Sequence, residues 1–160
     1  MNIKWKLLPI LFFGMLGFTN PVEADENEIR CLAENIYFEA RSESTAGRIA
    51  VALVVLNRVE DKRFPDSVCG VVKQTKYYPS GRIDLHSCQF SWYCDGKSDT
   101  PTEACWDEIY LLASVMMGWE AIDFTNGSLW YHSKKVNPNW APHYQQTVSI
   151  DNHIFYKPVD

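Results

Sequence analysis

Residues 45–59, T-A-G-R-I-A-V-A-L-V-V-L-N-R-V, carry apolar side chains on almost every side. Their length and the absence of turn residues after Gly47 favour a helix, although the valine run would suit a strand equally well. A helix that is apolar all round must lie at the centre of a domain, because each of its faces needs cover. A chain of 160 residues has room for one such domain with a sufficient core.

Two further helices are predicted from periodicity and capping signals. Residues 28–40 carry apolar side chains at the spacing of an amphipathic helix. These side chains are Ile29, Leu32, Ala33, Ile36, Tyr37 and Ala40. Thr100 as N-cap, Pro101 in the first turn and Glu103 as capping-box acid predict the start of the other helix. Its helical spacing continues until Gly118, which is predicted to end it.

The rest of the chain is predicted to form turns, one short helix and a few strands. Pro65 marks a turn, and a short helix is predicted from about Ser67. Residues 77–99 predict an irregular loop, and loops of this length inside compact domains are usually functional. Residues 128–133 and 147–156 have strand-like patterns, the latter with a hairpin turn. We therefore predict a mainly α-helical fold of the α+β class with a small C-terminal β element.

Residues 1–24 differ in composition from the rest and are typical of a secretory signal peptide. Lys4 and Lys6 precede an apolar run of about 12 residues, and cleavage is predicted after Ala24. The run is shorter than the roughly 20 residues that a membrane-spanning helix needs, so an uncleaved anchor is the second interpretation. We expect an exported protein, periplasmic or extracellular, with a single domain over residues 25–160.

The net charge and the cysteine content limit the binding partners and the cellular compartment that we expect. Cleavage after residue 24 would leave 13 basic and 19 acidic side chains, a formal charge of −6, which does not favour nucleic acid or anionic membrane. All five cysteines lie in the predicted exported part, where disulfides form. Cys88 with Cys94 is the first predicted pair and Cys31 with Cys69 the second. Cys105 is interpreted as a buried thiol.

Glu39 stands in the apolar stretch I-Y-F-E-A-R-S-E, with Glu43 four residues later. Burial of a carboxyl group raises its pKa, which produces a general acid at neutral pH. Arg41 is predicted to point away from Glu39 on a helix. If the helix continues to Glu43, a like charge raises the pKa further; if it ends at Arg41, Glu43 is a separate loop carboxylate. Spacing alone favours the plainer interpretation of two solvated surface acids.

Metal, cofactor and nucleophile motifs in the sequence give little support to a reaction other than acid catalysis by a carboxyl group. The four histidines, which are His86, His132, His143 and His153, are well separated and form no HExxH pair, so no metal site is predicted. A cysteine nucleophile with a histidine base is a further option, but disulfides or packing explain each cysteine more simply. Neither a Gly-rich phosphate loop nor a basic stripe occurs, and we expect no cofactor.

Aromatic residues make up 14% of the chain, and many lie outside the predicted helices. These are Tyr77, Tyr78, Phe90, Trp92, Tyr93, Trp130, Tyr131, Trp140 and Tyr144. Packing is the plainer interpretation of most of them. Some are interleaved with polar residues such as Gln89 and His132, which fits a groove that stacks on sugar rings and hydrogen-bonds their hydroxyl groups.

Five segments occur in a characteristic order along the chain. They are C-L-A-E-N-I-Y-F-E-A-R-S-E with the helix that follows, F-P-D-S-V-C-G-V-V, C-Q-F-S-W-x-C-D-G, Y-H-S-x-x-V-x-P-x-W and H-I-F-Y. Together they closely resemble the SleB/CwlJ-type cell-wall hydrolases, from about Glu28 to Lys157. The resemblance implies a compact helical domain similar to lysozymes and lytic transglycosylases, with a small β element lining a glycan groove.

The resemblance also implies an enzyme that attacks the glycan strands of peptidoglycan. The glutamate of the family's E-A-R-G-E motif, the catalytic acid, falls on Glu39, and Glu43 is the second candidate catalytic acid. The predicted sugar-binding residues are Gln89, Phe90, Trp92, Tyr131 and His132. The chain departs from the motif at Ser42, where the family usually has glycine; a glycine that needs a positive φ would make serine strained there and shift Glu43.

We expect a lytic transglycosylase, because no second carboxylate is evident on a facing segment. In that reaction the C6 hydroxyl of N-acetylmuramic acid is the nucleophile, so Glu39 alone suffices as acid and base. Hydrolysis would need a carboxylate such as Glu43 to activate water or attack the sugar. An amidase or peptidase acting on the stem peptide and a non-catalytic wall-binding module are the alternatives. Peptidoglycan is the expected partner, nucleic acid is not, and the protein is expected to be a monomer.

Overall fold

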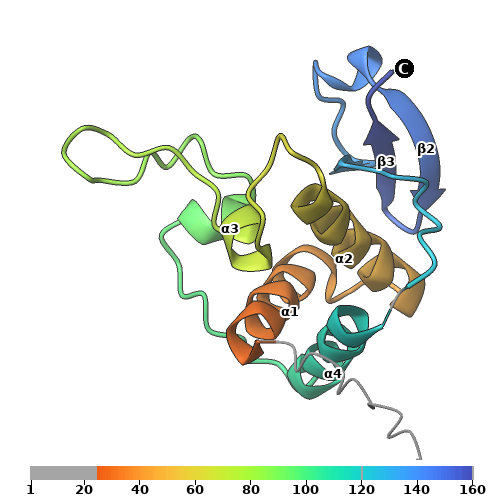
Figure 1. Ribbon diagram of the computed structural model, residues 1–160, viewed down its shortest axis with the longest axis horizontal. Coiled ribbons are helices and arrows are strands. Elements are labelled where there is room, and N and C mark those ends of the chain that lie inside the picture. Colours follow the sequence, from red (N-terminus) through yellow and green to blue (C-terminus); the bar gives the residue numbers. More distant parts are fainter. Residues whose placement is uncertain (1–24, 120, 160) are drawn as a thin grey trace, which may run out of the picture.

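The computed structural model describes residues 25–119 and 121–159 (Figure 1). The predicted signal peptide lies outside the described residues. Within the described residues, four α-helices and a three-stranded sheet confirm the predicted mainly α-helical fold with a small β element. No described helix is long and apolar enough to cross a membrane. The elements are α1 (Glu26–Ala40), α2 (Thr45–Glu60), α3 (Val68–Val72), η1 (Ser91–Cys94), α4 (Trp106–Gly118), β1 (Trp130–Ser133), η2 (Ala141–His143), β2 (Gln145–Ile150) and β3 (His153–Lys157).

Helix α2 occupies the centre of the molecule, as its all-round apolar sequence predicts (Figure 1). On one side, Ala52 and Val55 pack in a large core cluster with residues of α1, α3 and α4. On the other side, Val51 and Val54 pack with Phe155 of β3 in a second cluster. All five side chains are fully buried. Helix α2 is therefore covered by helices on one side and by the sheet on the other.

The sheet has the strand order β1-β3-β2, with both pairs antiparallel. The predicted C-terminal hairpin is confirmed as β2 and β3, and the first predicted strand begins at Trp130, two residues later than expected. Phe155 of β3 lies opposite Tyr131 of β1 and Val148 of β2. Residues opposite one another on neighbouring strands share a face of the sheet. Tyr131 is thereby directed toward the helices.

Helix α4 begins at Trp106, so the predicted start at Thr100 and Pro101 is wrong, whereas the predicted end at Gly118 is confirmed. The segment before it is bound to α1 instead of being helical. The carboxylate of Glu103 accepts a hydrogen bond from Arg41 at 3.0 Å. The backbone N–H groups of residues 102 and 103 both donate to the hydroxyl of Tyr37 at 3.2 Å. These long-range bonds occupy the groups that an N-terminal cap would use.

Helix α3 is fastened to α1 by both covalent and polar bonds. The short helix expected from Ser67 is confirmed, and the Ser67 hydroxyl accepts from the Gly70 N–H at 3.1 Å. The carboxylate of Glu28 accepts from the Val68 N–H at 2.6 Å. The predicted disulfide between Cys31 and Cys69 is confirmed and joins the same two helices. Helices α1 and α3 are therefore joined directly, before the long loop that follows.

The loop predicted over residues 77–99 is irregular except for η1 and one isolated bridge between Tyr77 and Ile83. The predicted disulfide between Cys88 and Cys94 is confirmed and links this loop to η1. Cys105 is free and only partly buried, in contrast to the buried thiol expected there. The cysteine left outside the two disulfides is thus the one that directly precedes α4.

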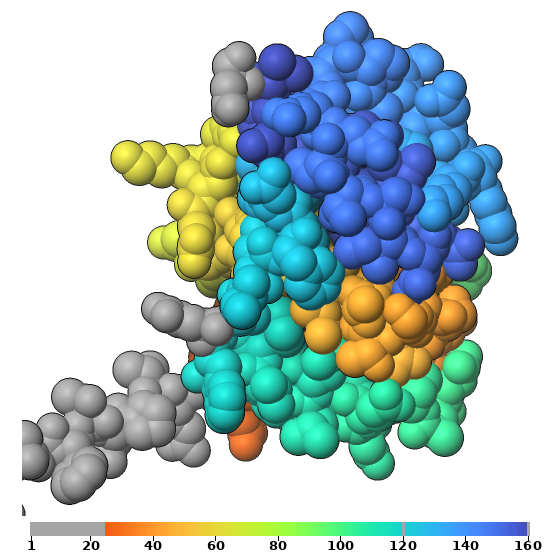
Figure 2. Space-filling view, turned by 90° about the vertical axis from the view of Figure 1, so that its right-hand side faces the viewer, coloured from red at the N-terminus to blue at the C-terminus, as the bar shows by residue number. Residues whose placement is uncertain are grey.

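The corner between α1 and α2 is bound to the β2–β3 turn. The backbone N–H and the hydroxyl of Ser44, the N-cap of α2, donate to the Asp151 carboxylate at 2.9 and 2.6 Å. The Glu43 carboxylate accepts from the backbone N–H and side-chain amide of Asn152 at 3.2 and 3.1 Å. Figure 2 shows the start of α2, in orange, directly below the dark blue turn. The contact is close because the first turn of α2 contains Gly47, which has no side chain.

Replacement of Gly47 tests how much this contact stabilises the fold. A Cβ atom at Gly47 would meet an Asp151 carboxylate oxygen at 2.5 Å and the Cβ of Glu43 at 2.8 Å. Gly47→Ala should therefore lower the free energy of unfolding by about 1–3 kcal/mol, measured by denaturant titration. Gly118→Ala is the control, because nothing lies within 4 Å of its Cβ position. Equal stability of the two variants would contradict a tight corner.

Candidate active site

Glu39 lies in the last turn of α1, one residue before the helix ends. Its carboxylate accepts a hydrogen bond from the Tyr131 hydroxyl at 3.2 Å, although the two residues are 92 positions apart. Tyr131 reaches the acid because β1 directs it toward the helices, where its ring packs against Phe155. The candidate site is therefore formed where the end of α1 meets the sheet.

The environment of Glu39 is that of a general acid. Burial raises the pKa of Glu39 above its ordinary value, and this outweighs the hydrogen bond from Tyr131 and the positive charge of Arg58, which both lower it. Arg41, the basic residue nearest in sequence, is bound to Glu103 and lies over the Tyr37 ring. The charge of Arg41 is therefore paired with Glu103 and not with Glu39, and burial decides the protonation of Glu39.

Arg58 is a site residue that periodicity did not reveal. It belongs to the last turn of α2, is only 4% exposed, and donates from Nε to the Leu129 carbonyl at 2.7 Å. Its guanidinium lies over the rings of Phe64 and Phe90, at 5.2 and 5.3 Å from their centroids. Nη1 has no hydrogen-bond partner among the described residues. The only available signal was an arginine near the end of an otherwise apolar helix.

Arg58 stays charged despite its burial. Burial lowers the pKa of Arg58 to about 10, while the nearby Tyr131 and Glu39 act to raise it. The guanidinium is thus protonated at neutral pH and brings a positive charge to the site. No direct ion pair with Glu39 forms within 4.0 Å in the described part of the chain. Arg58 can therefore act on Glu39 through its field.

Tyr131 is a hydrogen-bond donor that does not ionise. Burial, and secondly the negative charge of Glu39, raise the pKa of Tyr131 well above its ordinary value. Its ring also lies edge-on to the buried His153, with centroids 5.3 Å apart. The phenol is thus fixed between the sheet and α1 as a neutral donor to the acid.

The floor of the site is built from α1 and η1. Asn35, one turn before Glu39 on the same face of α1, is fully buried and accepts from the Trp92 indole N–H at 3.2 Å. Trp92 stacks on Phe38 with centroids 4.6 Å apart. Trp92 is 7% and Phe90 4% exposed, so both lie in the core. Their predicted contacts with sugar depend on the small part of each ring that reaches the surface.

Among the described residues, two other predicted site residues form hydrogen bonds with partners other than Glu39. His132 follows Tyr131 on β1 and points to the opposite face of the sheet, with its Nε2 2.9 Å from the Tyr156 hydroxyl and its Nδ1 2.9 Å from the Ser133 carbonyl. Gln89 is exposed, and its backbone N–H donates to the Gln74 carbonyl at 3.0 Å. Direct contact of His132 and Gln89 with substrate stays a prediction.

Glu43 does not lie beside Glu39, because α1 ends at Ala40. Its carboxylate is bound to Asn152 in the contact between the α1–α2 corner and the β2–β3 turn. Of the two alternatives for this acid, the separate loop carboxylate is the one observed. Ser42 is not among the residues with positive φ, so serine is not strained where the family usually has glycine.

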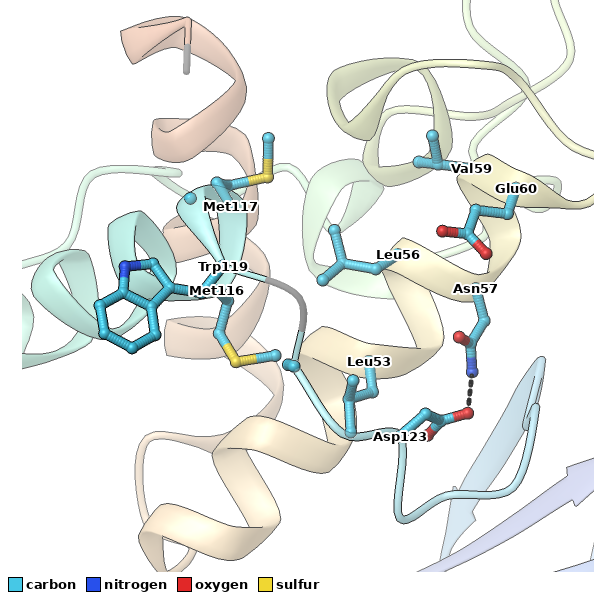
Figure 3. A pocket seen from close by; sticks show the side chains of 11 residues that line it. Leu53, Leu56, Asn57, Val59, Glu60, Met116, Met117, Trp119 and Asp123 are labelled. Carbon is cyan, nitrogen blue, oxygen red and sulfur yellow. Dashed lines mark hydrogen bonds between the residues drawn. The ribbon is translucent and has the colours of Figure 1, made fainter. Parts of the chain in front are cut away.

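A cavity of about 630 Å³ lies away from Glu39, between α2 and the end of α4 (Figure 3). Leu56 and Met116 line it, and an Asn57 to Asp123 hydrogen bond of 3.1 Å closes one rim. Glu39 is not among the lining residues. We assign the candidate chemistry to Glu39, because among the described residues it is there that a half-buried acid meets a neutral donor and a buried cation.

Comparison with known proteins decides the family. The family model of cell wall hydrolases matches residues 42–156. The chain belongs to this family. A spore cortex-lytic enzyme of Bacillus subtilis is 46% identical over 145 residues, which cover 87% of this chain and 38% of that protein. One from Oceanobacillus iheyensis is 29% identical over 140 residues, which cover 86% and 44%. The chain thus spans less than half the length of these curated relatives.

Solved structures confirm the predicted resemblance and its fold. The catalytic domain of the Bacillus cereus SleB protein superposes with a TM-score of 0.60 at 30% identity, covering 86% of this chain and 94% of that one. The catalytic domain of the germination-specific lytic transglycosylase SleB from Bacillus anthracis gives 0.57 at 28% identity, covering 86% and 100%. The family model begins three residues after Glu39, but a match over 86% of a 160-residue chain necessarily extends over α1.

Removal of the Tyr131 hydroxyl tests the hydrogen bond to the acid. Because this bond lowers the pKa of Glu39, Tyr131→Phe should raise that pKa further above its ordinary value. The carboxyl carbon of Glu39, followed by NMR during a pH titration, reports the change without any assay of activity. Tyr156→Phe is the control, because its hydroxyl contacts His132 instead. A lower pKa in Tyr131→Phe would contradict the proposed geometry.

Proposed function

We propose that this chain is an exported enzyme that cleaves peptidoglycan glycan strands between N-acetylmuramic acid and N-acetylglucosamine as a lytic transglycosylase. The observation that carries the proposal is the half-buried Glu39, with its raised pKa, held by Tyr131 beside the charged Arg58. Its relatives are named spore cortex-lytic enzymes, and one solved neighbour is named a lytic transglycosylase. Family membership supports the cell wall as the substrate.

In the first step, the protonated Glu39 donates its proton to the glycosidic oxygen, and the bond from that oxygen to the muramyl C1 breaks. In the second step, the Glu39 carboxylate takes the proton of the muramyl C6 hydroxyl while that oxygen bonds to C1. A 1,6-anhydro ring closes and Glu39 is protonated again. No water is consumed, so a single acid serves both steps.

The surroundings of Glu39 suit both of its protonation states. Burial keeps the carboxyl group protonated for the first step. After proton transfer, the Tyr131 hydroxyl and the positive charge of Arg58 stabilise the carboxylate, since both lower its pKa. A group with a pKa closer to the working pH exchanges its proton more readily in both directions.

The position of Glu43 favours transglycosylation over hydrolysis. Hydrolysis by a second carboxylate needs that group free beside the sugar, either to activate water or to attack C1. The Glu43 carboxylate instead accepts hydrogen bonds from two donors of Asn152. We therefore propose that Glu43 supports the fold at the corner and that Glu39 carries the proton alone.

Export and partners complete the proposal. Two disulfides favour an oxidising compartment, periplasmic or extracellular, and fit a cleaved signal peptide over residues 1–24. A net charge of −5 gives no general attraction to nucleic acid. We propose that the protein acts on peptidoglycan as a monomer with a single catalytic domain over residues 25–160.

Substitution of the acid tests the reaction. Glu39→Gln should lower the rate of glycan cleavage about 10²- to 10⁴-fold, because the amide cannot donate and recover a proton. Glu34→Gln, on the same helix, should keep most activity. Digestion of purified sacculi followed by mass analysis identifies the bond cleaved. Anhydromuropeptides support transglycosylation and reducing ends indicate hydrolysis, whereas free stem peptides would indicate an amidase or peptidase, and binding without any product a wall-binding module.

Substitution of Arg58 tests its electrostatic role. Arg58→Met keeps an apolar stem but removes the charge, so the pKa of Glu39 should rise and kcat should fall about tenfold or more as the carboxylate loses stabilisation. Arg58→Lys keeps the charge and should recover part of the rate. Thermal unfolding of both variants separates this effect from loss of the bond to Leu129. Identical kcat and Glu39 pKa values in the two variants would contradict the proposed role.

A further inference from the structure

Residues 75–88 project from the body of the protein as an arm, seen in Figure 1 as the loop that leaves α3 and returns toward η1. A hydrogen bond of 3.0 Å from the Gln89 N–H to the Gln74 carbonyl closes the base of the arm. The disulfide between Cys88 and Cys94 ties the same base to η1. The arm is thus attached next to the floor of the candidate active site, which η1 supplies through Trp92.

The arm is held in shape by its own hydrogen bonds. The N–H of Asp84 donates to the Lys76 carbonyl at 2.8 Å, and the N–H of Tyr78 donates to the Arg82 carbonyl at 2.8 Å. Gly81, with φ of 80°, turns the chain at the tip. The Ser87 hydroxyl accepts from the Lys76 N–H at 2.8 Å. Such a structure can hold a ligand without first paying the ordering entropy of a mobile loop.

The arm presents large side chains that remain exposed in the described part of the chain. Tyr78 is 43% and Leu85 is 61% exposed. Together with Arg82, Ile83 and His86 they line a cavity of about 540 Å³, a size typical of ligand sites. Exposed apolar residues gathered around a cavity and rimmed by polar groups mark a binding surface.

Arg82 is available for an anionic ligand. Ion pairs are formed by Arg30, Arg41, Arg48 and Arg63, and Arg58 is buried. Arg82 is exposed, and no carboxylate of the described residues lies within 4.0 Å of it. Its guanidinium is held over the Tyr78 ring, 5.3 Å from the centroid. Asp84, the acid of the arm, instead accepts hydrogen bonds from the Tyr78 hydroxyl and the His86 N–H.

We propose that the arm binds the carboxylate-bearing stem peptide of the peptidoglycan strand, outside the site of cleavage. Arg82 receives a peptide carboxylate, since a guanidinium pairs with carboxylates through two parallel hydrogen bonds. Tyr78 and Leu85 receive the small apolar side chains beside it. In Figure 1 the arm projects to the left of α3 while the sheet lies to the right of α2, so under this proposal a bound polymer contacts the arm at a distance from the sheet. This inference rests on the proposed function.

Binding to glycan strands with and without stem peptides tests the arm. Arg82→Ala and Arg82→Glu are combined with Glu39→Gln, so that binding is measured without turnover. Both variants should bind peptide-bearing strands about tenfold more weakly, which corresponds to a loss of ~1.4 kcal/mol in binding free energy. Their binding of peptide-free strands should be unchanged. Arg30→Ala, which removes an exposed arginine paired with Glu34 on α1, is the control and should match the parent on both strands.

Kinetics separate this inference from the proposed function. With Glu39 intact, Arg82→Ala should raise KM on peptide-bearing strands and leave kcat unchanged, while peptide-free strands are cleaved as by the parent. Equal affinity of parent and variants for peptide-bearing strands, or an equal loss on both kinds of strand, overturns the role of the arm. Absence of cleavage of any strand by the parent protein would overturn the proposed function instead.

Discussion

Helix α2 needs cover on two sides, because it is apolar almost all round, and this need organises the rest of the structure. Helices α1, α3 and α4 cover one side, and the sheet covers the other. Polar bonds attach the sheet near both ends of α2: Ser44 binds Asp151 at the beginning, and Arg58 binds the Leu129 carbonyl at the end. The candidate site lies at the seam between the two covers, where α1 and β1 meet beside α2.

The same seam explains why the candidate site has unusual electrostatics. Arg58 binds the segment before β1 with its guanidinium in the core, and Glu39, in the last turn of α1, lies against Tyr131 of β1. Desolvation opposes the charged form of both groups. The acid responds by holding its proton, whereas arginine, with its high intrinsic pKa, remains charged. Because the folded-state pKa of Glu39 lies above its unfolded-state pKa, stability falls as the pH rises past the unfolded-state pKa, and the loss is complete above the folded-state pKa.

Patterns that act over a few residues predicted much of this fold. The centre at α2, the stripe of α1, the hairpin and the disulfide between Cys88 and Cys94 follow from spacing, composition and short loops. The disulfide between Cys31 and Cys69, which are 38 positions apart, was the second predicted pair and has no such short-range signal. The prediction of where α4 starts was wrong. Thr100, Pro101 and Glu103 form a locally complete capping signal, but Glu103 binds Arg41 in the folded chain instead of capping a helix. A helix-start signal is a preference of about 1 kcal/mol, which tertiary bonds can outweigh.

The candidate site itself was predicted only in part, because its parts are distant in sequence. Spacing alone favoured a surface acid at Glu39, and the resemblance identified it as the catalytic acid, but neither gives the hydroxyl of Tyr131 or the charge of Arg58 as its partners. Glu43 was ambiguous because its role depended on where α1 ends.

The arm differs from these parts in one physical respect. It is held by its own hydrogen bonds and one disulfide, so the core places little demand on its exposed side chains. Tyr78 and Leu85 remain largely exposed in the free protein. Under the proposal, the stem peptide covers them, which makes the arm the part of the chain where substrate preference can change without disturbing Glu39.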